Sequence, residues 1–455
     1  MQSPSPTTEM PGADDVYREA FGVLLVQQGR GFYVTLELMA ILWGTKQMGS
    51  QILPPFSKDL KDDRRLTYRQ RSHDFARRLM ADGSKDLSEE ERQFLVGDST
   101  VEILRELLSS LMVPIPNRQK LTTWKGLHFY PYVGELIHYD AVQRGGRNIM
   151  ERYTYRGGGA LIHKILRTDP DQRRLEDNRE GLGGLIADAE GPLGQLALAC
   201  AGHDAIPQRN FPDGIEPETE PRESIWVEHI RKGTRNITTR ANTTRAKKVE
   251  MLMHWLPYCL ARYQLDVAAR VVGTRSPELP IALLQYPNPI RGLARKEMVR
   301  SRSLVDQALA TTLNEMTLNE ANQDRRDRFK ELQAKKGWKN TATVFFSQTM
   351  ASCGALNAHV GSYYLTIKMP LLEAIVCSAL EPDESVEFEV FCHEVLFEKF
   401  RLVIDRKSAA SSGLLNEVDA TFFSKNSEKL ANDLSDLGML SAYSDATRMI
   451  HGEVR

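Results

Sequence analysis

Apolar side chains recur at spacings of three and four residues along most of this chain, which is the pattern of helices with one buried face. In the first part of the chain such stripes occur at residues 16–25, 36–43 and 101–111. Ser99 offers N-cap chemistry for the third stripe, and Pro114 cannot continue it. The pattern therefore predicts helices over these three stretches.

The same spacing continues through the middle of the chain. Its clearest stripe consists of Val249, Leu252, Leu256, Cys259, Tyr263 and Val267. Pro287 and Pro289 then interrupt the chain before a long helix that we expect over residues 293–319. This region is therefore predicted to be helical with a core-facing side.

From Pro370 onward the pattern changes to short elements. The predicted order is helix, strand, two helices and a terminal hairpin, which is the order of a winged-helix domain. The elements are expected at residues 371–380, 386–388, 388–400, 424–437 and 439–450. Between them, residues 402–404 favour a strand and residues 408–413 a loop. In the third helix Leu430, Leu434 and Leu437 form the inner face.

The ends of this third helix carry their own signals. Ser424 or Asn426 can serve as its N-cap. Gly438 fits the left-handed position that follows a helix C-terminus.

A length of 455 residues predicts more than one domain. Asp204 to Pro221 holds four prolines and an acidic bias, and this stretch is the clearest boundary signal in the chain. We predict a mainly α, multi-domain helical protein with a C-terminal winged-helix (α+β) module. The expected parts are a disordered tail at 1–14, a helical domain at 15–115, a basic and aromatic helical segment at 116–203, an acidic proline-rich linker at 204–221, a basic helical domain at 222–340 and the winged-helix module at 341–455.

Composition places this protein among globular chains that bury a core, with 41% hydrophobic and 26% charged residues. Five scattered cysteines without a C-x-x-C pair indicate reduced thiols, as in the cytoplasm. The apolar stretch at 34–43 is too short to span a bilayer. We therefore expect a cytoplasmic protein that does not contact membranes.

Charge is unevenly distributed although the net charge is only −1. Residues 222–302 carry sixteen basic against six acidic side chains, and residues 117–167 carry nine against three. Such surfaces bind phosphate backbones in a salt-sensitive way. The residues predicted to bind nucleic acid, with DNA as the expected partner, are Arg231, Lys232, Arg235, Arg240, Arg245, Lys247, Lys248, Arg291, Arg295, Lys296 and Arg300. The alternative is that these clusters are solvated helix faces that pair with acids of other segments.

The C-terminal module has the opposite charge. Residues 366–455 hold nine basic and sixteen acidic side chains, and carboxylates repel phosphates. The exposed face of the third helix is predicted to include Lys425, Asn426, Lys429 and Asn432. We favour docking of a protein partner by this face over direct reading of DNA, which remains the alternative.

Catalytic motifs are weak throughout. Gly157 to Gly159 precede an apolar helix and could cradle a phosphate, but the spacing is not that of a P-loop and a flexible turn is the simpler interpretation. His138 with Asp140, and Glu389 with His393, lack a further ligand at metal spacing. We find no G-x-S-x-G and no dinucleotide fingerprint. No catalytic residue, metal ligand or cofactor is predicted, although a nuclease built from dispersed acids remains open.

The segments Pro370–Ala374, Val386–Phe388, Leu434–Leu440 and Ser444–Ala446 resemble winged-helix tails of proteins from prokaryotic defence operons. The methylation-associated multi-gene anti-phage systems are one candidate. The resemblance covers about a fifth of the chain and implies an accessory subunit. The expected function is thus a non-enzymatic, nucleic-acid-binding and partner-docking subunit of a bacterial anti-phage defence or DNA-processing complex. A cryptic nuclease of the same system and a winged-helix transcriptional regulator are the alternatives.

Overall fold

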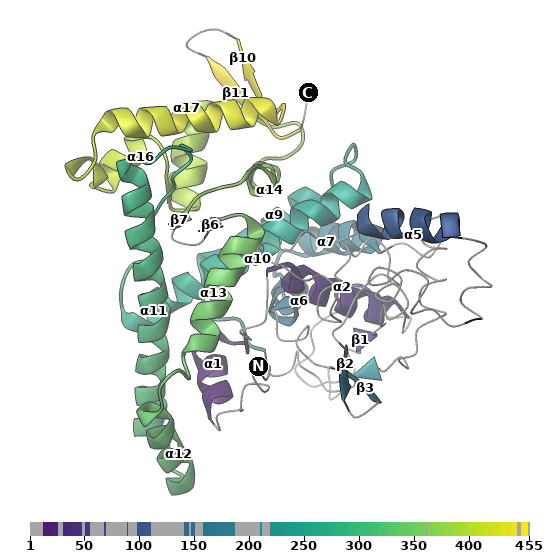
Figure 1. Ribbon diagram of the computed structural model, residues 1–455, viewed down its shortest axis with the longest axis vertical. Helices are drawn as coiled ribbons and strands as arrows, with labels where there is room; N and C mark the ends of the chain where they lie inside the picture. Colours follow the sequence, from purple (N-terminus) through teal and green to yellow (C-terminus); the bar gives the residue numbers. More distant parts are fainter. Residues whose placement is uncertain are drawn as a thin grey trace. The chain divides into compact units, whose positions relative to one another are not determined.

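A computed structural model describes the chain over residues 12–25, 31–47, 51–54, 68–69, 89, 98–110, 141–144, 147–150, 158–186, 210–211, 219–359, 362–443 and 447–453 (Figure 1). Of these residues 68% are helical and 7% lie in strands, so the predicted mainly α class is confirmed. None of the helices within these ranges has the length and apolarity needed to cross a membrane.

The chain divides into two compact units that are not continuous in sequence. Unit 1 comprises residues 1–31, 218–237 and 254–455, and unit 2 comprises residues 32–217 and 238–253. One boundary, after Pro217, falls inside the predicted linker at 204–221. Most of the predicted segment 222–340 belongs to the same unit as the C-terminal module.

Unit 2 is described mainly by its helices. They are α2 (Gly31–Gln47), α5 (Asp98–Ser110), α6 (Gly159–Arg167), α7 (Gln172–Leu185) and the first two turns of α10 (Arg245–Val272). Two short antiparallel pairs accompany them, β1 (Tyr68–Arg69) with β4 (Asn210–Phe211) and β2 (Ala141–Arg144) with β3 (Arg147–Met150). The expected helix at 101–111 is present as α5, but Ile103 and Leu107 are exposed and only Leu108 of the described stripe is buried.

Helices also form the first part of unit 1. They are α1 (Ala13–Phe21), α9 (Ile225–Thr238), the remainder of α10, α11 (Pro289–Asn319), α12 (Gln323–Ala334) and α13 (Asn340–Cys353). The predicted stripe from Val249 to Val267 is buried throughout, as expected. The helix α11 begins four residues earlier than expected, because Asn288 caps it and Pro289 takes its first position.

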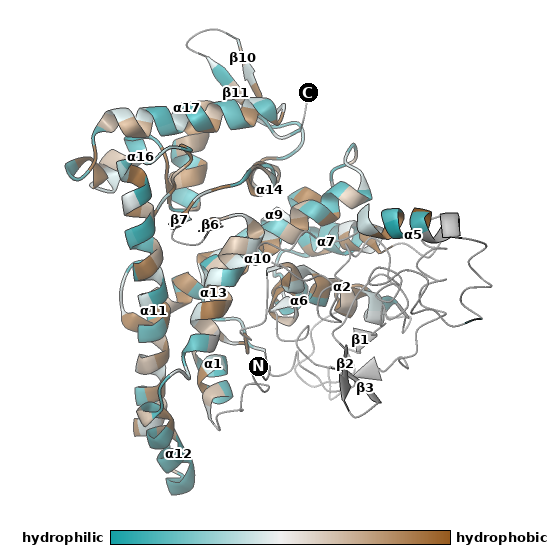
Figure 2. Ribbon diagram, in the orientation of Figure 1, coloured by the Kyte–Doolittle hydropathy of each residue, from teal (hydrophilic) through white to brown (hydrophobic). Residues whose placement is uncertain are grey.

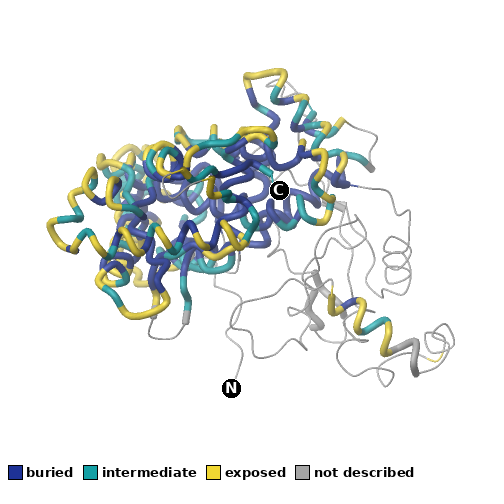
Figure 3. Tube along the Cα trace, turned by 90° about the horizontal axis from the view of Figure 1, so that it is seen from above, coloured by how far each residue is buried: buried dark blue, intermediate teal, exposed yellow. Residues whose placement is uncertain are grey.

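The long helix α11 is the spine of unit 1. It packs against α1, α12 and α13 and against β7 (Ser362–Leu365), which forms a hairpin with β6 (Leu356–His359). The helix α12 is hydrophilic along its length and buries only Phe329 and Leu332 (Figure 2). In Figure 3 buried residues run through the interior of the described part of the chain, with exposed residues around them.

The C-terminal part of unit 1 consists of short elements, as the sequence predicts. In order they are α14 (Met369–Ala379), β8 (Ser385–Glu387), α15 (Phe388–Val390), the π-helical segment η6 (Phe391–Lys399), β9 (Leu402–Val403), α16 (Arg406–Ser411), the 3₁₀ turn η7 (Leu414–Asn416), α17 (Ala420–Asp436), β10 (Leu440–Ala442) and β11 (Arg448–His451). The last two strands form a hairpin at the end of α17 (Figure 1). The strand β8 pairs with β11, so the three-stranded antiparallel sheet has the order β10-β11-β8.

The strand β9 belongs to a different sheet. It pairs in parallel with β5 (Leu279–Pro280), which lies before α11 in sequence. The amide of Leu279 donates to the carbonyl of Arg401 at 2.8 Å, and that of Ile281 donates to Val403 at 3.0 Å. The predicted strand at 402–404 is thus present, with a partner that the local sequence does not reveal.

Two local predictions in this region are wrong. The expected loop at 408–413 begins as the helix α16, because Asp405 and Ser408 form a capping box. The expected cap of α17 at Ser424 or Asn426 is replaced by Asp419, whose carboxylate accepts from Thr421 N at 2.8 Å, so α17 begins earlier. In both helices an aspartate outside the predicted range provides the N-cap.

The predicted end of α17 is confirmed. Gly438 has a φ of 71°, and its amide donates to Ser435 while that of Met439 donates to Leu434. These two bonds form the Schellman pattern and satisfy carbonyls at the helix end.

Candidate functional site: an arginine-lined pocket beside the basic face of α11

The helix α11 carries the predicted basic residues that are best placed for a ligand. Arg295, Lys296 and Arg300 are exposed on neighbouring turns. Lys296 lies 3.4 Å from Glu417 and Arg300 lies 3.8 Å from Glu297. Exposed pairs at these distances are weak, so both cations can exchange their partner for a phosphate.

Arg291 has another role although it belongs to the same cluster. Its guanidinium donates to the carbonyls of Leu284 and Gln285 and lies 4.8 Å from the Tyr364 ring. These contacts fold the chain back over the first turn of α11. Arg291 is therefore a structural residue of the loop before this helix.

The predicted residues from Arg231 to Lys248 lie partly in each unit. Lys232 is exposed and Arg231 half-buried, whereas Arg235 forms an ion pair of 2.7 Å with Glu381. Arg240 is only 1% exposed and cannot present its charge at the surface.

The remaining three predicted residues of this run, Arg245, Lys247 and Lys248, are half-buried. Lys248 donates to the Thr238 carbonyl at 2.8 Å, and burial together with the neighbouring Arg240 charge lowers its pKa. The burial of Arg240 and the hydrogen bond of Lys248 indicate that this end of the run stabilises unit 2.

The helix α17 presents few free cations. Lys425 and Asn432 are exposed, but Lys429 pairs with Asp433 one turn away. Asn426 is fully buried and does not belong to the exposed face. Its side-chain oxygen accepts from Leu283 N at 2.8 Å, and its amide donates to the carbonyls of Ile281 and Ile404 at 3.0 Å each.

The acids of this module are also paired in part. The guanidinium of Arg448 in β11 bridges Glu428 of α17 and Glu389 of α15, at 3.0 and 2.7 Å. It also lies 4.3 Å from the Phe388 ring. The hairpin, α17 and α15 are therefore joined by one partly buried arginine.

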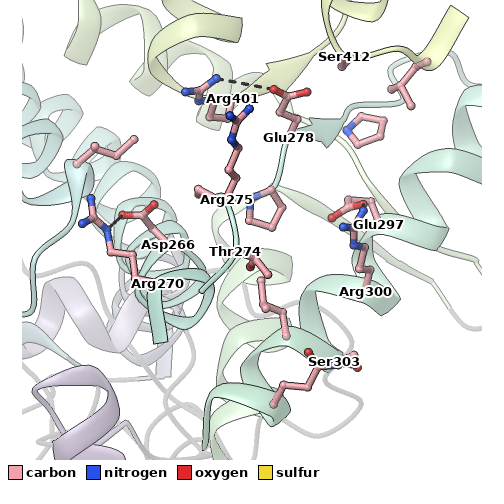
Figure 4. Close-up of a pocket in the computed structure, with 17 residues that line it drawn as sticks. Asp266, Arg270, Thr274, Arg275, Glu278, Glu297, Arg300, Ser303, Arg401 and Ser412 are labelled. Carbon is pink, nitrogen blue, oxygen red and sulfur yellow. Dashed lines mark hydrogen bonds and ion pairs between the residues drawn. The ribbon is translucent and has the colours of Figure 1, made fainter. Parts of the chain in front are cut away.

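A pocket of about 790 Å³ opens beside the exposed face of α11 (Figure 4). Its walls come from the C-terminal end of α10, the loop 273–278, β5, the middle of α11 and the residues around α16. It contains four arginines and three carboxylates, together with hydroxyl groups. The charged members are Arg270, Arg275, Arg300, Arg401, Asp266, Glu278 and Glu297.

The arginines of this pocket differ in how far they are neutralised. Arg270 lies 2.9 Å from Glu223 and 3.6 Å from Asp266, so its charge is shared between two acids. Arg401 has Glu278 at 3.8 Å. Arg275 has neither a hydrogen bond nor an ion pair with any described residue, and in Figure 4 it points toward Arg401 and Glu278. Two guanidinium groups therefore face one carboxylate, which leaves this side of the pocket positive.

Glu297 forms the opposite wall. Burial raises its pKa to about 7, against the smaller lowering effects of Arg300 and Arg262. One of its carboxylate oxygens is buried without a hydrogen-bond partner among the described residues. The pocket therefore becomes more positive when Glu297 takes up a proton near neutral pH.

Arg262 of α10 supports the pocket from inside the core. It is 1% exposed, donates to the carbonyls of Phe400 and Pro277 at 3.2 and 3.4 Å, and lies 5.2 Å from the Trp226 ring. Since Pro277 and Arg401 both line the pocket, these bonds fix two of its walls. Burial of a guanidinium costs free energy, which these hydrogen bonds offset, so we assign Arg262 a structural role in holding the pocket walls.

The glycine segment offers no phosphate cradle. The amide of Gly159 donates to a carboxylate oxygen of Glu37 at 2.8 Å, and Glu37 is buried. A Cβ at Gly159 would lie 2.5 Å from Leu38 N and 2.6 Å from Val34 O. The start of α6 is therefore already occupied by an anion of the protein, and Gly159 serves close packing of α6 on α2.

The histidine and cysteine motifs that the structure describes do not form a reactive centre. Cys392 is buried and burial raises the pKa of its thiol, while the His393 ring lies 3.4 Å from Glu398. His138 and Asp140 lie outside the described residues. Within the described part of the chain no three His, Cys, Asp or Glu side chains are grouped so that they could hold a metal ion.

Sequence reasoning identified Arg300 but missed the rest of the pocket. Arg275 follows Gly273, which ends α10 with a φ of 75°, and that helix end was the available local signal. Arg401 reaches the pocket through the pairing of β9 with β5, for which no sequence pattern exists. No known protein family, curated protein or solved structure matches this chain.

Proposed function

We propose that this chain is a non-enzymatic subunit that binds nucleic acid through the exposed basic face of α11. The observation that carries the proposal is the placement of Arg295, Lys296 and Arg300 on neighbouring exposed turns of one rigid helix. Arg302 is exposed a little further along the same helix.

The binding mode would be contact with the phosphate backbone. Arginine and lysine displace condensed counterions from a polyanion, and this gain does not depend on base sequence. The paired acids Glu417 and Glu297 contribute little competition, because the first pair is exposed and the second is long. Binding should therefore be sensitive to salt and tolerant of sequence.

The C-terminal module is proposed to be a winged helix that docks a protein partner. The order of its elements and the β10-β11-β8 sheet support this identification. Its net charge is negative, and Lys429 and Arg448 are already paired with acids. A partner with a basic surface fits this face better than DNA does. The bacterial anti-phage defence or DNA-processing complex expected from the sequence would supply such a partner.

The test uses the purified full chain and a labelled DNA duplex in fluorescence anisotropy at several salt concentrations. Arg295→Glu with Lys296→Glu should weaken binding by about tenfold or more and reduce the slope against salt. The matched control is Lys425→Glu with Asn432→Ala on α17, which should leave binding unchanged.

Three outcomes would overturn this assignment. Absence of binding at low salt, or binding that does not respond to salt, removes the nucleic-acid surface. Loss of binding in the α17 variant alone favours a winged-helix regulator that reads DNA directly. Metal-dependent cleavage of the duplex by the purified chain favours a nuclease.

A further inference from the structure

The pocket beside α11 has features that backbone binding does not require. Its volume of about 790 Å³ lies within the range of small-molecule sites and far exceeds what a single phosphate group fills. Its charged side chains come from the end of α10, the loop 273–278, α11 and Arg401, whereas the basic face of α11 is an open row on one helix.

The positive side of the pocket is suited to an anion. Arg275 has no acid partner among the described residues, and Arg401 has only the long 3.8 Å contact with Glu278. Figure 4 shows both guanidinium groups on the same side of the pocket. Guanidinium groups bind phosphate through paired hydrogen bonds, and two that face one carboxylate retain a net positive charge.

The rest of the lining is suited to hydrogen-bond donors and apolar groups. The Ser276 hydroxyl and one oxygen of Glu297 are buried and have no partner among the described residues. Buried polar atoms of this kind are costly unless a ligand or water satisfies them. Apolar surface from Pro277, Pro280 and Leu304 lies in the same pocket.

We propose that this pocket binds a phosphorylated small molecule of nucleotide size, with its phosphate between Arg275 and Arg401. The hydroxyl or amino donors of the ligand would face Glu297 and Ser276, and its less polar part would lie on the prolines and Leu304. This site goes beyond the proposed nucleic-acid surface: Arg300 belongs to both, but Arg295 and Lys296 do not line the pocket, and Arg275 and Arg401 do not belong to the exposed face of α11.

The experiment is isothermal titration calorimetry of the full chain with ADP, GDP, inorganic pyrophosphate and adenosine. At least one nucleoside diphosphate should bind more tightly than pyrophosphate, and adenosine should bind far more weakly. Arg275→Ala should weaken that binding by about tenfold or more, as expected for loss of a charged hydrogen-bond donor. Arg401→Asn should do the same, and Asn tolerates the left-handed backbone at this position, where φ is 56°.

The matched control is the double variant Arg295→Glu with Lys296→Glu, which should bind the nucleotide as the parent does although its binding of DNA is weakened. Thermal unfolding of each variant checks that the fold persists, and Arg275 is exposed, so its truncation should not disturb the core. The proposal is overturned if no nucleoside diphosphate binds, if pyrophosphate alone binds, or if Arg275→Ala and Arg401→Asn bind as the parent chain does. Failure of DNA binding with retained nucleotide binding would overturn the proposed function alone.

Discussion

Asn426 is predicted to be among the most sensitive polar positions of unit 1. The residue lies in the middle of α17 but is fully buried, and its amide group makes three hydrogen bonds to backbone atoms. Two of these partners, Leu283 and Ile281, precede α11, and the third, Ile404, follows β9. One side chain therefore connects three segments that are far apart in sequence.

The perturbation is Asn426→Ala. Removal of the amide leaves three buried backbone groups without this partner, at a cost of about 1–3 kcal/mol each, so we expect a loss of at least about 3 kcal/mol in the free energy of unfolding. The matched control is Asn432→Ala on the exposed side of the same helix. That change should alter the free energy by less than about 0.5 kcal/mol, because surface substitutions in helices have small effects.

The assay is urea unfolding followed by tryptophan fluorescence, since Trp226, Trp255 and Trp338 are buried in unit 1. The midpoint of Asn426→Ala should fall well below those of the parent and of Asn432→Ala. Equal midpoints for the two variants would refute the structural role of Asn426. If Asn426→Ala remained as stable as the parent but bound DNA less well, Asn426 would belong to a recognition surface, as the sequence predicts.

Two further changes test the raised pKa of Glu297 and the close packing of α6 on α2. Burial raises the pKa of Glu297 in the folded state to about 7, so the stability that its protonated form confers is present below the unfolded value of 4.5 and is lost as pH rises to about 7. In urea unfolding, Glu297→Gln should therefore be more stable than the parent by about 2–3 kcal/mol at pH 8 and nearly equal to it at about pH 4.5. The exposed control Glu315→Gln should show no such difference between the two pH values. A stabilisation that is the same at both pH values would contradict this. Gly159→Ala should lower the free energy of unfolding by about 2–3 kcal/mol, because its Cβ would meet backbone atoms of α2. The control Gly184→Ala in α7, where no atom lies within 4 Å of the added Cβ, should be neutral or stabilising. Hydrogen exchange of the α6 amides measures the effect of Gly159→Ala, and unchanged protection would exclude the clash.

Much of the helical architecture could be predicted from the sequence because it depends on local periodicity. The stripe from Val249 to Val267 and the long helix α11 follow from apolar spacing and from a proline at a helix start. The end of α17 at Gly438 was equally local, since a left-handed residue after a helix favours glycine.

The candidate pocket could not be predicted because long-range pairing assembles it. Arg275 lies in the loop before β5, Arg300 in α11 and Arg401 just before β9, and their approach depends on the parallel contact of β5 with β9. Charge counts also mislead where burial decides. Arg240 and Asn426 resemble surface residues by type, yet tertiary packing places both in the interior.

The pairing of β5 with β9 also limits which C-terminal fragment of this protein can fold on its own. A fragment that starts at residue 341 or 370 would lack the strand at 279–280 and the backbone partners of Asn426, and it would expose the edge of β9. The region is therefore not a self-contained cassette, and recombination between genes could exchange it intact only together with the preceding helix α11. A C-terminal piece that keeps these contacts must begin no later than β5, at residue 279.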